Sequence, residues 1–177
     1  MIKRLAFPLL ALFFVLAQYS LIGVPSPVAG SAILFICLVA LSEHDMRHMK
    51  LPNALTAILA TCGLLVVATQ WPVLLRDHIL AALFWGALLW VISEVWFRRT
   101  KRDVLGLGDV KLIAASALWL GPAVSQAVVL GSVAGLIYGT ARGFWGSTTA
   151  FAFGPFICIS VWIVWSWHGF GPLGIVG

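Results

Sequence analysis

Seven stretches of the chain are almost continuously apolar, and short polar segments separate them. They cover residues 5–24, 28–41, 54–71, 79–97, 110–120, 123–138 and 150–167. Most of them approach the ~20 apolar residues that a helix needs to cross a bilayer. The pattern therefore predicts an all-α fold, a polytopic transmembrane helix bundle of about seven spans.

The composition agrees with this fold class. Hydrophobic residues make up 62% of the chain and charged residues only 10%, which excludes a water-soluble domain. Four tryptophans stand near the ends of predicted spans, where an indole ring favours the membrane interface: Trp71, Trp119, Trp165 and Trp167. We expect the three cysteines, Cys37, Cys62 and Cys158, to be buried thiols that bind no zinc and form no disulfide.

The fifth apolar stretch is shorter than the others, because Gly121 and Pro122 end it soon after Val110. At ~1.5 Å per residue it would cross only about half of a ~30 Å hydrocarbon core. We therefore expect its start to be recessed, with Gly106 and Gly108 allowing backbone bends and Asp109 lining a water-filled cavity.

The positive charges predict the orientation. If the spans alternate in direction, every Lys and Arg except Arg76 falls on one face of the membrane, which identifies the cytoplasmic side and places the N-terminus there. Residues 1–27 resemble a signal peptide in outline, but their apolar run continues to Val24. We interpret them as a retained anchor span that precedes a peptidase core at 28–177. The basic run 98–102 is interpreted as a topology determinant that touches lipid head groups.

Two aspartates at the cytoplasmic ends of spans are the candidates for chemistry. Asp45 follows the second stretch, and Asp109 begins the fifth. Ionisable groups at membrane depth are costly and usually functional, and two carboxylates that share a proton provide one acid and one base for hydrolysis. Lys111 and Arg47, each two residues from an aspartate, point to other helix faces and are expected to extend toward water. Taken alone, Asp45 is better explained as an interfacial residue paired with Arg47 or His48, and it is the glycine-flanked Asp109 that favours the functional interpretation.

Other polar residues have simpler explanations. Glu94 stands four residues before Arg98, which predicts an ion pair within one helix. His44 and His48 share a helix face, but Pro52 follows closely and the helix is not expected to persist, so we predict no metal site. The segment Gly106 to Gly108 lacks the Lys and Ser or Thr of a phosphate-binding loop. We expect no cofactor and no nucleic-acid partner.

Three motifs together resemble a known family. They are Asp45 with Leu51-Pro52-Asn53, then the run Gly106 to Leu112, and then Phe153-Gly154-Pro155-Phe156 in the last span. Their order and spacing are similar to those of the prepilin peptidases, the GxGD-type intramembrane aspartyl proteases. The resemblance extends from Asp45 to the last span.

The resemblance implies that Asp45 and Asp109 are the catalytic dyad. It implies a substrate as well, namely a prepilin or pseudopilin precursor that is cut at the cytoplasmic face of the membrane after a short basic leader, while its apolar helix stays in the bilayer. Residues next to the dyad would support it. They are Gly106 and Gly108, which let the substrate approach Asp109, together with Lys111, Pro52, Asn53, Gly154 and Pro155.

One feature of the larger members is missing from these 177 residues. Those members carry a zinc-binding insertion with paired Cys-x-x-Cys motifs, associated with N-methylation, and no Cys-x-x-Cys occurs here. The resemblance is therefore to the short, protease-only type found with Flp pili and in archaeal preflagellin peptidases, and we do not expect methyl transfer.

Two other classes of protein remain open from the sequence. A proton-coupled transporter would use Asp45, Asp109 and Glu94 as a relay, although all three lie toward one face and the two halves of the chain do not repeat each other. A non-catalytic membrane scaffold would tolerate the loss of either aspartate.

Overall fold

A computed structural model describes residues 28–100, 106–142 and 152–168. This part of the chain is all α-helical, as predicted. Its helices are α2 (Val28–His48), α3 (Asn53–Gln70), α4 (Leu75–Thr100), α5 (Leu107–Leu120), α6 (Val124–Ala141) and α7 (Gly154–Trp167), with the short 3-10 turns η1 (Pro72–Leu74) and η2 (Gly121–Ala123). All six stretches predicted after residue 27 are helices. The predicted first span and anchor lie outside the described residues.

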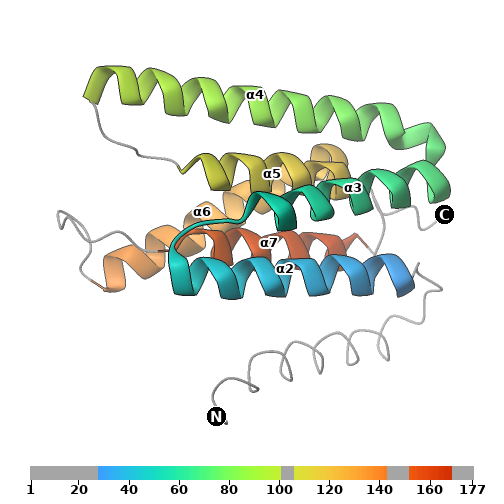
Figure 1. The fold of residues 1–177 in the computed structure, drawn as a ribbon, viewed down its shortest axis with the longest axis horizontal. Coiled ribbons are helices and arrows are strands. Elements are labelled where there is room, and N and C mark those ends of the chain that lie inside the picture. Colours follow the sequence, from blue (N-terminus) through green and yellow to red (C-terminus); the bar gives the residue numbers. More distant parts are fainter. Residues whose placement is uncertain (1–27, 101–105, 143–151, 169–177) are drawn as a thin grey trace, which may run out of the picture.

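Helix α5 occupies the middle of the bundle and packs against α3, α4 and α7. Helix α2 packs against α3 and α7, and α6 covers another side of α7. Successive helices alternate in direction, and α6 runs back toward the end of the bundle at which α5 begins (Figure 1). The C-terminal ends of α2, α4 and α6 therefore meet the N-terminal ends of α3, α5 and α7. We call this the dyad end, because it holds both candidate aspartates.

The basic residues gather as the alternation predicts. Arg47 lies in the last turn of α2, Arg98 and Arg99 lie in the last turn of α4, and Arg142 follows α6, all at the dyad end. Arg76, in the first turn of α4, lies at the opposite end. Among these positively charged residues, only Arg76 lies away from the dyad end.

Within the described residues, three helical segments are long and apolar enough to cross a membrane: Asn53–Gln70, Pro72–Arg99 and Leu107–Ala141. The last consists of α5, η2 and α6 and reverses direction at η2 (Figure 1). Helix α5 has 14 residues, so it rises only about 21 Å and is short, as predicted. It begins at Leu107 rather than Val110, and it is therefore longer than the apolar run alone indicated.

Two tryptophans predicted at the interface are instead buried in the core. Trp119 and Trp165 are both 0% exposed, and their rings meet edge to face at 5.7 Å. Each indole N–H has a partner inside the bundle: Trp119 donates to the Leu59 carbonyl at 2.8 Å, and Trp165 donates to Ser31 Oγ at 3.1 Å. These bonds remove the need for interfacial water. Trp167 agrees with the prediction, since it is 85% exposed.

Small residues allow α6 and α7 to pack closely. A Cβ added at Gly131 would lie 2.8 Å from the Ile157 side chain, and one added at Gly135 would lie 2.8 Å from the Phe153 ring. Without side chains at these positions the two helices can approach each other. This packing holds the start of α7 at the dyad end.

Candidate active site

Asp45 lies in the last turns of α2, which continues beyond the apolar run and ends only at His48. Its side chain is 5% exposed. The backbone N–H of Gly154, the first residue of α7, donates a hydrogen bond to Asp45 Oδ2 at 3.0 Å. The first N–H groups of a helix lack partners within that helix. The N-cap residue of α7, Phe153, makes no side-chain hydrogen bond to them, so the Asp45 carboxylate of α2 caps α7 instead.

Gly154 is required by this contact. A Cβ at position 154 would lie 2.7 Å from Asp45 Oδ2, which is closer than a carbon and an oxygen can pack. The Gly154-Pro155 pair lies inside the predicted last span, 150–167. It instead begins α7, because Pro155 fits the first turn, where its missing N–H costs nothing.

Asp109 lies in the first turn of α5 and is half-buried. Its backbone N–H donates to the Gly106 carbonyl at 3.0 Å, which starts the helix. The prediction that Gly106 and Gly108 bend the backbone is wrong: Gly106 has φ −63°, and Gly108 is an ordinary helical residue. Their role is close approach, since a Cβ would lie 3.3 Å from Asp109 Oδ2 at Gly106 and 3.1 Å from Leu51 Cβ at Gly108.

The two carboxylates are close enough to interact. Asp45 and Asp109 lie within electrostatic range of each other, and the Cys158 thiol of α7 lies within electrostatic range of both. Cys158 is 3% exposed, so the prediction of a buried thiol is confirmed, but its proximity to the aspartates was not predicted. The signal available was its position four residues after Gly154, which places both on one face of α7.

The predicted supporting residues of α3 and α5 also meet. Pro52 precedes α3 with φ −71°, and Asn53 is its first residue, one position before the predicted apolar stretch begins. Lys111 Nζ donates to Asn53 Oδ1 at 2.9 Å. Both side chains are exposed, and Lys111 extends toward water, as expected.

The remaining charges near the dyad pair locally. Arg47 pairs with Glu43 rather than with Asp45. Glu94 forms the predicted ion pair with Arg98, at 2.7 Å.

The two histidines of α2 stack on each other, with ring centroids 4.4 Å apart. The helix does persist through His48, contrary to expectation. His44 Nδ1 contacts the Lys50 carbonyl at 2.8 Å. In the described ranges, no three or more His, Cys, Asp or Glu side chains are grouped as a metal site would require.

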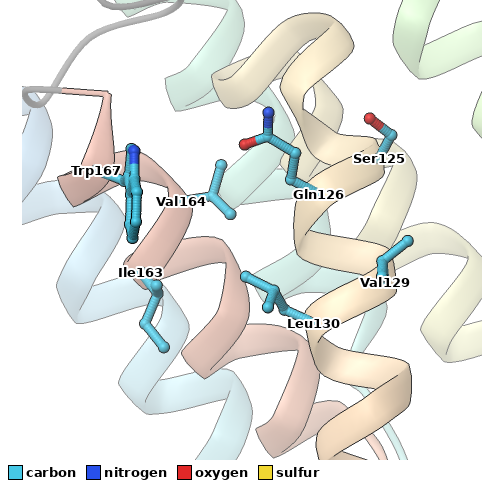
Figure 2. A pocket seen from close by; sticks show the side chains of 7 residues that line it. All are labelled: Ser125, Gln126, Val129, Leu130, Ile163, Val164 and Trp167. Atoms are coloured by element: carbon cyan, nitrogen blue, oxygen red, sulfur yellow. The ribbon is translucent and has the colours of Figure 1, made fainter.

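A groove of about 560 Å³ lies between α6 and α7 (Figure 2). Its walls are mostly apolar, with Ser125 and Gln126 as polar residues at the start of α6 and Trp167 at the end of α7. These ends are opposite to the dyad end, so the groove is separate from the aspartates (Figure 1).

Residues 32–140 match the type IV leader peptidase family. The chain belongs to that family. The matched segment includes both Asp45 and Asp109, while Gly154 lies beyond it.

Curated members of the family align over most of this chain. The prepilin leader peptidase/N-methyltransferase of Xanthomonas campestris is 32% identical over 143 residues, which are 78% of this chain and 50% of that protein. The enzyme of the same name from Neisseria gonorrhoeae is 31% identical, over 77% of this chain and 48% of that protein. The type 4 prepilin-like proteins leader peptide-processing enzyme of Escherichia coli O78:H11 is 34% identical, over 88% and 58%.

The chain thus spans about half the length of the curated relatives that it matches. No solved structure matches it.

Proposed function

We propose that this chain is a membrane-embedded aspartic endopeptidase that removes the leader from prepilins or pseudopilins. The observation that carries the proposal is the position of Asp45 and Asp109 in a member of this family. The two carboxylates come from different helices and interact at one end of the bundle. The family match favours this function over the proton-coupled transporter.

The chemistry follows from two carboxyl groups that hold one proton between them. The ionised carboxylate takes a proton from water as the water oxygen bonds to the scissile carbonyl carbon, and the neutral carboxyl polarises the carbonyl oxygen. The tetrahedral intermediate then collapses. The C–N bond breaks, the leaving amine receives a proton, and a new carboxyl terminus is left on the leader.

The neighbouring residues support this chemistry by holding the two aspartates. Gly154 and Pro155 begin α7 against Asp45, and Gly106 leaves room beside Asp109.

The substrate class comes from the relatives, whose names specify prepilin leaders. We infer that the basic dyad end faces the cytoplasm of a bacterial cell, in the inner membrane, because positive residues are enriched on that side. The chain would be a multi-pass protein with a cytoplasmic N-terminus. The apolar helix of the substrate would remain in the bilayer beside it.

The test is co-expression with a prepilin from the same organism. Asp45→Asn or Asp109→Asn should abolish leader removal while protein abundance is unchanged. Asp77→Asn, at the opposite end of the bundle on an exposed residue of α4, is the matched control and should process normally. Normal processing by either dyad variant would refute the dyad, and a scaffold role would predict that outcome.

We assign only the peptidase step to these residues and no methyl transfer. Mass spectrometry of the mature pilin N-terminus tests this, with the expected product carrying a free, unmethylated amine when this chain is the sole processing protein. A methylated amine under those conditions would contradict it.

A further inference from the structure

The helices that carry Asp45 and Asp109 are joined mainly through other elements. Helix α2 packs against α3 and α7, while α5 packs against α3, α4 and α7. The separation of the two carboxylates therefore depends on what links α2 to α5 at the dyad end. The connection between α2 and α3, residues 49–52, lies there, followed by Asn53 as the first residue of α3 (Figure 1).

On one side this connection is tied to α2. The Met49 N–H donates to the Asp45 carbonyl at 2.8 Å, and His44 Nδ1 contacts the Lys50 carbonyl at 2.8 Å. Met49 has φ 50°, a left-handed conformation that is unfavourable for a non-glycine residue. Such a conformation persists only where the surrounding contacts fix it.

On the other side it is tied to the first turns of α5. Leu51 packs so closely on Gly108 that a Cβ there would lie 3.1 Å from Leu51 Cβ. Asn53 Oδ1 accepts a hydrogen bond from Lys111 Nζ at 2.9 Å. Gly108 and Lys111 flank Asp109 in the sequence, so both contacts act on the turn that holds the second carboxylate.

We propose that residues 49–53 form a brace that sets the separation of the two carboxylates. Leu51, Asn53 and Lys111 are its positioning residues. The brace deepens the proposed function and rests on it where catalysis is concerned. A displacement of about 1 Å in a catalytic group can lower a rate about a hundredfold, so weak exposed contacts can matter greatly here.

Steady-state kinetics on a purified prepilin in proteoliposomes test the polar contact. Asn53→Ala and Lys111→Ala should each lower kcat by about tenfold with KM nearly unchanged. The double variant should be no slower than either single variant, because both remove one interaction. Asn53→Asp should restore kcat, since its carboxylate also accepts from Lys111. Gln70→Ala, an exposed residue at the opposite end of α3, is the control.

The apolar contact has its own test. Gly108→Ala should lower kcat because the new methyl group pushes against Leu51, and adding Leu51→Ala should recover part of it. A raised KM with unchanged kcat in the Asn53 and Lys111 variants would mean that these residues bind substrate instead. Additive losses in either pair would overturn the brace.

Cross-linking tests the brace without using activity. The chain has three cysteines, which are first replaced by Ser, and Asp45→Cys and Asp109→Cys are then introduced. A short bis-methanethiosulfonate reagent should join the pair, and Leu51→Ala or Asn53→Ala should lower the yield several-fold. An unchanged yield overturns the brace even if prepilin is processed. A lowered yield supports it even if wild-type protein fails to process prepilin, an outcome that would refute only the proposed function.

Discussion

The amide of Gly154 donates a hydrogen bond to the carboxylate of Asp45 at 3.0 Å, across 109 residues of sequence. This contact joins the end of α2 to the start of α7, and it fixes how the Asp45 carboxyl is oriented. A charged acceptor at the N-terminus of a helix is favoured by the helix dipole and by the unpaired N–H groups there.

Gly154→Ala should therefore impair processing more than it impairs folding. The new Cβ would lie 2.7 Å from Asp45 Oδ2 and would displace the carboxylate. We expect kcat to fall about a hundredfold, measured by leader removal from a purified prepilin. Gly86→Ala is the matched control, because its Cβ meets only Ala114 at 3.3 Å, between α4 and α5. Equal loss of activity in both variants would argue against a specific effect on Asp45.

Substitution of Gly121 is expected to lower the stability of the protein, because this is the described glycine with a positive φ. It has φ 56°, a region that favours glycine, and a Cβ would lie 2.8 Å from Nε2 of the buried His78. His78 Nδ1 contacts the Leu118 carbonyl at 3.0 Å, so α4 is held against the end of α5 at this turn. Gly121→Ala should cost at least about 1–3 kcal/mol from the backbone alone, seen as a lower melting temperature in detergent. A melting temperature equal to wild type would contradict this packing.

The helices and the two aspartates could be predicted because each leaves a local signal. Long apolar runs report membrane depth, and an aspartate beside such a run is costly enough to suggest function. Hydropathy did not predict where the helices end. Helix α2 continues past its apolar run to His48, because hydropathy records where the membrane core ends and not where the hydrogen bonding of the helix ends.

Contacts between distant helices could not be predicted from those signals. Nothing local to Gly154 indicates that its amide meets Asp45, and nothing local to Cys158 indicates that its thiol lies within electrostatic range of both carboxylates. Trp119 was misplaced for the same reason. Its position near a span end suggested the interface. In the structure its ring is buried inside the bundle, because Gly63 of α3 has no side chain that would occupy the same space.

Trp119 should be among the residues on which the fold depends most. Its side chain is fully buried, and a Cβ at Gly63 would lie 2.6 Å from the indole. Trp119→Ala leaves a cavity and removes the N–H bond to Leu59, which should destabilise the protein by about 3–5 kcal/mol. Trp90→Ala, on the exposed face of α4, is the control and should change the melting temperature little. The reverse order of the two effects would refute this assignment of the core.

Glu94 distinguishes the peptidase from a proton relay. Its carboxylate pairs with Arg98 at 2.7 Å, and their side chains are 37% and 75% exposed, so the pair should contribute only about 0.3–0.5 kcal/mol. Glu94→Gln should leave prepilin processing within a factor of about two of wild type, since that energy corresponds to roughly this ratio at 25 °C. A transporter that passes protons through Asp45, Asp109 and Glu94 would lose its proton-dependent uptake in liposomes with the same substitution. Processing assays and uptake assays on one preparation of this variant therefore separate the two functions, and loss of processing would place Glu94 in the catalytic machinery.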